Sequence, residues 1–181
     1  RAGRPARTSR TAISRSTMKT ADMPVSLRQA THADIPLLIK ARFDFLRALG
    51  YPIIAEELPE ASLLIESFLS EHLNRDIFAW IGLEGETIAA AGFLQVYQVM
   101  WQPKAPKGRF GRIINVLTWQ EYRRQGLARE IMQALIQKAR ELDLAYLDLD
   151  ASPEGQPLYE SLGFKLVHAE HPPMCLFLSQ E

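Results

Sequence analysis

The sequence has a single cysteine among its 181 residues, so it cannot form an internal disulfide bond. A chain without disulfides is typical of a reducing compartment, and we therefore expect a cytoplasmic protein. Cys175 lies in the apolar run 174–178, whose composition is typical of a β-strand. We expect this thiol to be buried and chemically inert.

Long apolar runs are also absent. None approaches the ~20 residues that a membrane-spanning helix requires, so we expect a soluble protein that needs no membrane partner. Hydrophobic residues make up 47% of the chain, which is enough for one sizeable core. No internal repeat is present, and nothing indicates a second folded domain.

Acidic residues are missing from residues 1–17, which contain five of the 21 basic residues. All 21 acidic residues follow, so the chain from Met18 onward has a net charge of −5, which does not favour a nucleic-acid partner. We interpret residues 1–22 as a disordered leader, derived from an expression vector or from upstream translation. The folded domain is then expected over residues 23–181.

Two common nucleotide-binding patterns are absent, because the chain has neither a Walker motif nor a G-x-G-x-x-G run after its first strand. It has instead the sequence R-R-Q-G-L-A at residues 123–128, between the apolar run 113–117 and an amphipathic helix predicted to end near Leu142. The first N–H groups of a helix lack intrahelical partners and carry partial positive charge, so they bind phosphate well. Gly126 would let a ligand approach the backbone closely. This segment therefore predicts an anion site.

The remaining elements follow from apolar periodicity and end signals. A helix is expected to begin at Thr31, with Asp34 completing a capping box, and to end before Gly50. Further helices are expected over 60–73 and 126–142, and strands are expected over 25–29, 77–83, 87–97, 113–118, 146–150 and 174–178. This order of elements predicts an α+β domain with a mixed sheet.

The pattern R-x-x-G-x-A at 123–128 resembles the pyrophosphate-binding motif of the GNAT superfamily, the acyl-CoA-dependent N-acetyltransferases. Downstream, residues 158–164 read L-Y-x-x-x-G-F, which is similar to a second segment of the same family. The matching order of motifs and elements extends over residues 113–167. The resemblance implies a single-domain GNAT-like fold, with a mixed, mostly antiparallel sheet flanked by helices. It also implies a central strand-helix-strand unit whose two strands splay apart to bind acyl-CoA.

The resemblance further implies acetyl-CoA as cosubstrate and no metal. An acetyl group would pass by direct attack to a primary amine of a small molecule or peptide. Tyr159 matches the family's tyrosine that acts as general acid toward the departing thiolate, although a packed helix aromatic is the alternative. Asn115 could orient substrate or water, or it could make a cross-strand hydrogen bond.

Main-chain groups of Val116 and Thr118 would pair with the pantetheine arm as an added strand does. Ser152 stands where the family commonly has asparagine, and it can still hydrogen-bond CoA. The alternative for the 123–128 segment is an ordinary turn whose arginines pair with Glu121 and Glu130. The cofactor-binding residues that the resemblance implies are Val116, Leu117, Thr118, Arg123, Arg124, Gln125, Gly126, Leu127, Ala128, Arg129 and Ser152.

The sequence identifies no general base. The candidates are interpreted as solvated surface groups, and they are Glu56, Glu57, Asp148, Asp150, His168 and His171. A catalytically weak acyl-CoA-binding regulatory protein is therefore kept as an alternative. So is a protein-interaction module that uses Trp101 and the basic loop 101–110. A homodimer is left open.

Overall fold

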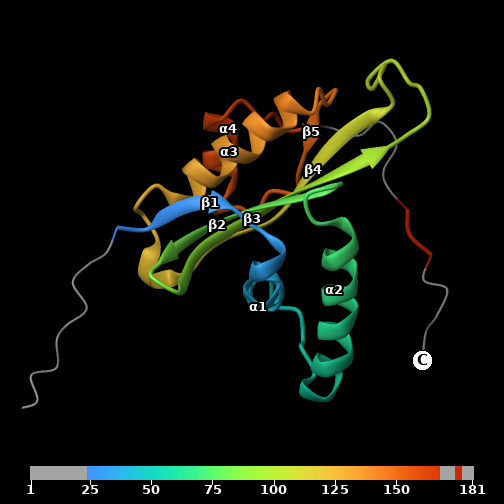
Figure 1. Cartoon of the computed structure of the whole chain (residues 1–181). Coiled ribbons are helices and arrows are strands. Elements are labelled where there is room, and N and C mark those ends of the chain that lie inside the picture. The colour runs from blue at the N-terminus through green and yellow to red at the C-terminus, as the bar shows by residue number, and fades with distance from the viewer. Residues whose placement is uncertain (1–23, 168–173, 177–181) are drawn as a thin grey trace, which may run out of the picture.

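The structure is a computed structural model, and it describes residues 24–167 and 174–176 (Figure 1). The predicted leader, residues 1–22, lies outside the described residues. So do His168 and His171, and residues 177–178 of the last predicted strand.

A five-stranded sheet with the spatial order β1-β2-β3-β4-β5 forms the centre of the domain. Its strands are β1 (Ser26–Gln29), β2 (Ile77–Glu84), β3 (Thr87–Gln98), β4 (Arg109–Thr118) and β5 (Leu147–Asp148). Strands β1 to β4 pair with one another in antiparallel fashion, whereas β5 runs parallel to β4. The predicted mixed, mostly antiparallel sheet is confirmed.

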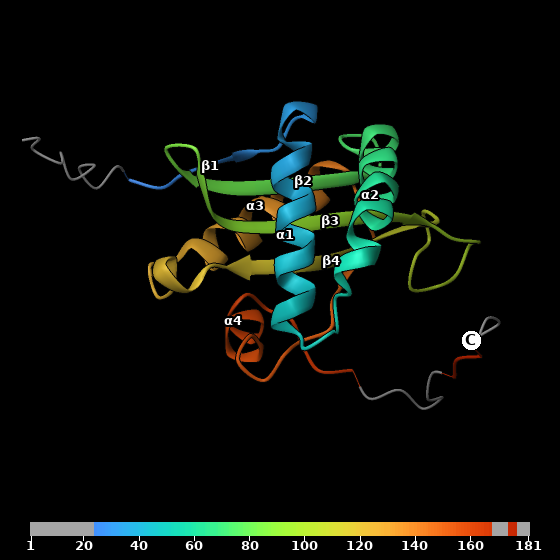
Figure 2. The same cartoon turned by 90° about the horizontal axis from the view of Figure 1, so that it is seen from below.

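Helices cover both faces of this sheet. They are α1 (Ile35–Ala48), α2 (Leu58–His72), α3 (Leu127–Glu141) and α4 (Gln156–Ser161), with short 3-10 turns at His32–Asp34, Ala55–Glu57 and Gln120–Tyr122. Figures 1 and 2 show α1 and α2 on one face and α3 with α4 on the other. Each face has its own hydrophobic core. Within the described ranges, no helix is both long and apolar enough to cross a lipid bilayer.

Helix α3 packs directly on β3, because the apolar stripe of the helix lies over a glycine of the strand, Gly92. Ile131 and Leu135 are completely buried. A Cβ atom at Gly92 would lie only 2.6 Å from Cγ2 of Ile131, so only glycine permits this approach. The helix ends at Glu141 with Leu142 as its C-cap, close to the predicted end.

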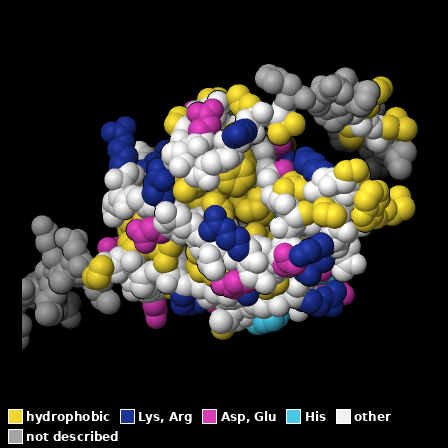
Figure 3. All heavy atoms as spheres, turned by 90° about the horizontal axis from the view of Figure 1, so that it is seen from above, with side chains coloured by type: hydrophobic (Ala, Val, Ile, Leu, Met, Phe, Trp, Pro, Cys, Tyr) yellow, Lys and Arg dark blue, Asp and Glu magenta, His cyan; other side chains and the backbone are white. Residues whose placement is uncertain are grey.

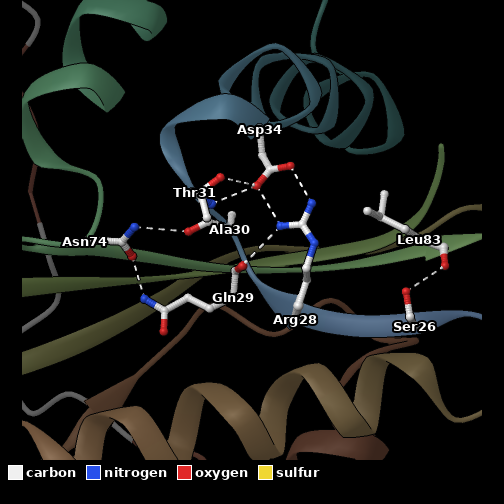
Figure 4. A network of polar contacts seen from close by, with 8 residues as sticks. All are labelled: Ser26, Arg28, Gln29, Ala30, Thr31, Asp34, Asn74 and Leu83. Carbon is white, nitrogen blue, oxygen red and sulfur yellow. Dashed lines mark hydrogen bonds and ion pairs between the residues drawn. The ribbon is translucent and has the colours of Figure 1, made fainter. Parts of the chain in front are cut away.

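A charged network fixes the start of α1 against β1 (Figure 4). Both terminal nitrogens of the Arg28 guanidinium donate to the Asp34 carboxylate at 2.7 Å, and the Thr31 backbone N–H donates to it at 2.8 Å. The predicted capping box is thereby confirmed. The Asn74 amide donates to the Ala30 carbonyl at 3.1 Å, which links the loop after α2 to the same corner.

We expect Asp34→Asn to lower the free energy of unfolding by about 2–3 kcal/mol at pH 7, because Asp34 is buried and its donors would lose a charged acceptor. Hydrogen bonds from Arg28 hold the pKa of Asp34 well below its ordinary value. The carboxylate therefore stabilises the fold above about pH 4, and this contribution is lost as the pH falls toward the folded-state pKa. Urea denaturation at pH 7, 5, 4 and 3 should show the difference shrinking below pH 4.

The control for this measurement is Asp143→Asn, since the Asp143 side chain is 71% exposed in its ion pair with Lys107. We expect a change of at most about 1 kcal/mol there. A difference between Asp34→Asn and the natural protein that stays constant down to pH 3 would contradict the linkage argument.

Two sequence predictions need correction. The strand predicted over 146–150 is only Leu147–Asp148, because β5 finds hydrogen-bonding partners on β4 at just two positions. The predicted burial of Cys175 is wrong, since this cysteine is exposed. Residues 174–176 are not in a strand.

Candidate active site

Strand β4 carries a β-bulge in its second half. The register with β3 shifts between Ala91 and Phe93, so Asn115 and Val116 together lie opposite Gly92. Asn115 has a φ of 57°, in the left-handed region that asparagine tolerates better than most residues. The bulge turns the side chain of Asn115 toward α1.

Beyond its first residues, β4 separates from β5. The two strands pair only at Gly111 with Leu147 and at Arg112 with Asp148. The β5-facing edge of β4 over 113–118 therefore has no strand partner among the described residues. Figure 3 looks onto the α3 and α4 face and shows hydrophobic side chains within a hollow near its centre. An unpaired strand edge beside an apolar hollow can accept an extended ligand as an additional strand.

The segment between β4 and α3 has a run of free backbone donors. In the described part of the chain, no acceptor exists for the N–H groups of residues 124–129, and the first α3 hydrogen bond runs from Glu130 N–H to the Gly126 carbonyl at 3.1 Å. Arg124 and Gly126 both have positive φ, 61° and 88°. Successive N–H groups in such a conformation form a concave anion site, and the α3 dipole strengthens it. Gly126 is the N-cap of α3.

The arginines around this segment do not pair with the neighbouring acids. Arg123 donates from Nε to the Thr118 carbonyl at 3.2 Å, and Arg129 donates to the Ser161 hydroxyl at 2.8 Å. None of the three arginines predicted here forms an ion pair with Glu121 or Glu130 within the ranges that the structure describes. Gln125 donates to the Glu121 carbonyl at 3.4 Å. The ion pairs expected if this segment were an ordinary turn are therefore not formed among the described residues.

The other residues predicted to bind the cofactor differ in how deeply they are buried. Leu127 is buried in the core beneath α3, whereas Ala128 is partly buried. Leu117 pairs with Ala91 of β3, and Thr118 has a buried hydroxyl oxygen without a hydrogen-bond partner among the described residues. A buried polar atom without a partner is costly unless a ligand or water satisfies it.

Tyr159 lies in α4, on the chain segment that follows β5, and it packs against the hydrophobic core on the α3 face of the sheet. Its ring packs over Gly155, where an added Cβ atom would lie 2.9 Å from Cε2 of Tyr159. Burial raises the pKa of the Tyr159 hydroxyl. This hydroxyl has no hydrogen-bond partner within residues 24–167 and 174–176. The nearby Ser152 hydroxyl accepts from the Gly155 N–H at 3.1 Å, which leaves its own O–H free to donate.

On the opposite face, a pocket of about 310 Å³ lies between α1, α2 and strands β2 to β4. Its lining is hydrophobic except for Arg42, Gln95 and Asn115. Asn115 is 2% exposed, donates to the Ala41 carbonyl at 3.2 Å and accepts from an Arg42 terminal nitrogen at 3.4 Å. The cross-strand hydrogen bond that the sequence left open for Asn115 is thus replaced by hydrogen bonds to α1.

We expect Asn115→Gly to lower the free energy of unfolding by about 1–3 kcal/mol, because the buried Ala41 carbonyl loses its side-chain donor. Asn115→Ala should cost about 1 kcal/mol more, since a φ of 57° disfavours a residue with a Cβ atom. Urea denaturation of both variants measures the two effects. Equal stability of the glycine and alanine variants would contradict the assignment of strain to this bulge.

The carboxylates considered as bases differ in their surroundings. Asp150 is 91% exposed in its ion pair with Arg112, and Glu56 and Glu57 are exposed in the turn before α2, as predicted for solvated groups. Asp148 is different: its Oδ1 is buried without a hydrogen-bond partner in the described part of the chain, and burial raises its pKa despite an Arg112 nitrogen at 3.3 Å. Among residues 24–167 and 174–176, no group of three or more potential metal ligands comes together.

The "Acetyltransferase (GNAT) family" matches residues 43–164. A predicted acetyltransferase from Clostridium acetobutylicum, whose crystal structure includes acetyl-CoA, is 25% identical, with a TM-score of 0.72 over 83% of this chain and 96% of that one. A GCN5-related N-acetyltransferase from Ralstonia eutropha is 24% identical, with a TM-score of 0.70 over 83% and 98%.

A more distant similarity extends to glucosamine-6-phosphate N-acetyltransferase from Arabidopsis thaliana. It is 18% identical, with a TM-score of 0.64 over 87% of this chain and 100% of that one. No curated protein matches the sequence.

Proposed function

The chain belongs to the acetyltransferase (GNAT) family and is an acyl-CoA-dependent N-acetyltransferase, and on this premise we propose that it transfers an acetyl group from acetyl-CoA to a primary amine of a small molecule or peptide by direct attack. The observation that carries the proposal is the run of unpaired N–H groups at 124–129 on the segment that joins β4 to α3, together with the unpaired β5-facing edge of β4. The GNAT-like fold expected from the sequence is confirmed.

In the proposed binding mode, the N–H groups from Arg124 to Arg129 hold the CoA pyrophosphate, and Arg124 adds charge from an exposed position. The main-chain groups of Val116 and Thr118 on the β5-facing edge of β4 pair with the pantetheine arm as an added strand does. Ser152 donates its free O–H to the cosubstrate from the β5 side. The acceptor amine enters from the pocket between α1 and α2, so the two substrates meet at the bulge near Asn115.

The proposed chemistry is a single displacement. The lone pair of the amine nitrogen attacks the thioester carbonyl carbon, the amide C–N bond forms, and the C–S bond breaks with its electron pair left on sulfur. The attacking nitrogen then loses its remaining extra proton to water, and the released thiolate takes up a proton from solvent. Tyr159 donates a hydrogen bond to that thiolate. Because burial raises the Tyr159 pKa above its ordinary value, the phenol is a weaker acid than the thiol, and stabilisation by hydrogen bonding is favoured over full proton transfer.

The amine must first lose a proton, which costs about 4.6 kcal/mol at pH 7 for an alkylammonium of pKa near 10.4. We assign this proton to water and not to a side chain, because no carboxylate lines the pocket. Gln95 and Asn115 are the polar groups in the pocket that can hold such a water molecule.

The proposal is tested with a panel of amines and peptides in the presence of acetyl-CoA, read by the release of free thiol. We expect thiol release that depends on the amine and equals the amount of amide formed. Tight acetyl-CoA binding without turnover on any acceptor would instead support the catalytically weak regulatory protein. Release that proceeds equally without amine would indicate hydrolysis and contradict the proposal.

A further inference from the structure

Arg42 is unusual among the arginines near α1. Arg28 pairs with Asp34 and Arg47 pairs with Asp44, each through a contact of 2.9 Å or less. Arg42 is partly buried, yet it forms no ion pair with any described carboxylate. Burial lowers the pKa of its guanidinium, as expected for a cation without a compensating anion. A desolvated cation of this kind is costly unless a ligand supplies the missing charge.

The position of Arg42 restricts where the ligand carries its negative charge. Arg42 is the single charged side chain among the described residues that line the pocket, and its terminal nitrogen lies 3.4 Å from Oδ1 of Asn115. In the proposed function the acceptor amine reaches the thioester at the bulge that contains Asn115. The anionic group of the acceptor must therefore lie close to its reacting amine.

The rest of the pocket is apolar. Its hydrophobic lining comes from α1, α2 and the sheet and includes Leu38, Leu64, Ile65, Phe68, Phe93 and Ile114. Leu64 and Phe68 are 66% and 43% exposed, so they stand at the open rim. A volume of about 310 Å³ is at the small end of ligand pockets and suits a compact acceptor.

We propose that the acceptor is a free α-amino acid with an apolar side chain. Its carboxylate pairs with Arg42, its amine lies at the Asn115 bulge, and its side chain fills the apolar pocket. An α-amino acid carries amine and carboxylate on one carbon, which matches the closeness of Arg42 to Asn115. A peptide N-terminus has no carboxylate on the carbon that bears its amine, and a simple alkylamine has none at all, so neither places an anion beside Arg42. This inference rests on the proposed acetyl transfer and specifies its substrate class.

The first test compares leucine, leucinamide, leucylglycinamide and isoamylamine as acceptors for the natural protein. We expect kcat/KM for leucine to exceed that for each of the other three at least tenfold, because a charge-assisted ion pair is lost in each. Leucinamide has the more acidic amine and so more free base at a given pH, which works against this expectation. A preference for leucine is therefore all the more informative.

The second test uses Arg42→Met with Arg47→Met as a matched control on the same helix. Arg42→Met should lower kcat/KM for leucine at least tenfold and should lower that for leucinamide much less. Arg47→Met should retain the preference for leucine, since Arg47 is exposed and does not line the pocket. Arg42→Lys, which keeps the charge, should recover part of the preference. If Arg42→Met fails to fold by circular dichroism, Arg42→Lys and the substrate comparison decide.

The outcomes separate this inference from the proposed function. Equal kcat/KM for leucine and leucinamide, or a better peptide substrate, would overturn the amino-acid assignment and leave acetyl transfer standing. Absence of turnover on every amine in a protein that binds acetyl-CoA by calorimetry would overturn the proposed function itself. A leucine preference that survives Arg42→Met unchanged would remove Arg42 from carboxylate recognition.

Discussion

Gly126→Glu is expected to weaken acetyl-CoA binding by a factor of one hundred or more. Charge-assisted phosphate contacts are worth roughly 1.5 to 3 kcal/mol each, and loss of two reaches that factor. The position of a Cβ at Gly126 is open apart from a Glu130 carboxylate oxygen at 3.9 Å, so the new side chain would extend into the space over the free N–H groups. Its negative charge would repel the pyrophosphate. Calorimetric titration with acetyl-CoA measures the effect.

Gly126 has a φ of 88°, so any side chain there also strains the backbone. This strain must be separated from the exclusion of the phosphate by the new side chain. Gly126→Ala introduces the strain, roughly 1–2 kcal/mol, without charge or bulk and should weaken binding far less. Gly163→Ala is the matched control for strain elsewhere, since Gly163 has a φ of 95° and open space around it. If folded Gly126→Glu binds acetyl-CoA like the natural protein, the phosphate site is placed wrongly.

Tyr159→Phe is expected to lower kcat about 100-fold or more, while acetyl-CoA affinity changes little. The hydroxyl is proposed to act on the developing thiolate, whereas the ring continues to pack over Gly155 and against Phe164. Because the Tyr159 pKa is raised, the donor stays protonated through neutral pH, and no loss of rate from this group is expected below about pH 10.

Single-turnover rates and calorimetric affinities measured side by side test this role. Tyr97→Phe is the control, because Tyr97 lies in β3 with its ring stacked on Phe110, away from the gap between β4 and β5. It should retain turnover. A Tyr159→Phe enzyme with unchanged kcat, under conditions where chemistry limits the rate, would exclude the assigned hydrogen bond.

Local patterns in the sequence predicted the parts of the site that depend on neighbouring residues. The anion segment at 123–128 and the apolar stripe of α3 follow from a strand, a glycine and a 3.6-residue period, all within thirty residues of one another. The capping box at Thr31 is equally local. These features were predictable because a short peptide already contains the interactions that define them.

Features that depend on tertiary contacts were not predictable in the same way. The Asn115 amide at the bulge donates to the Ala41 carbonyl of α1, and these residues are 74 positions apart. The pocket needs two helices and three strands to come together. Arg42 did give a signal: it follows Leu38 and precedes Leu46 at intervals of four, so a charged residue interrupts the apolar stripe of α1.

The packing of α3 on β3 helps to fix the distance between the start of α3 and the bulge in β4. Gly92 lies beneath Ile131 of α3 and opposite the bulge at Asn115, so one point of contact joins the helix that begins at the proposed phosphate segment to the strand that we propose holds the thioester end. The packing of α3 on the sheet therefore helps to fix the distance between those two ends. In the proposed binding mode, this distance selects the length of the cosubstrate arm. An arm of the right length places its reactive carbon at the bulge, whereas a shorter or longer arm does not.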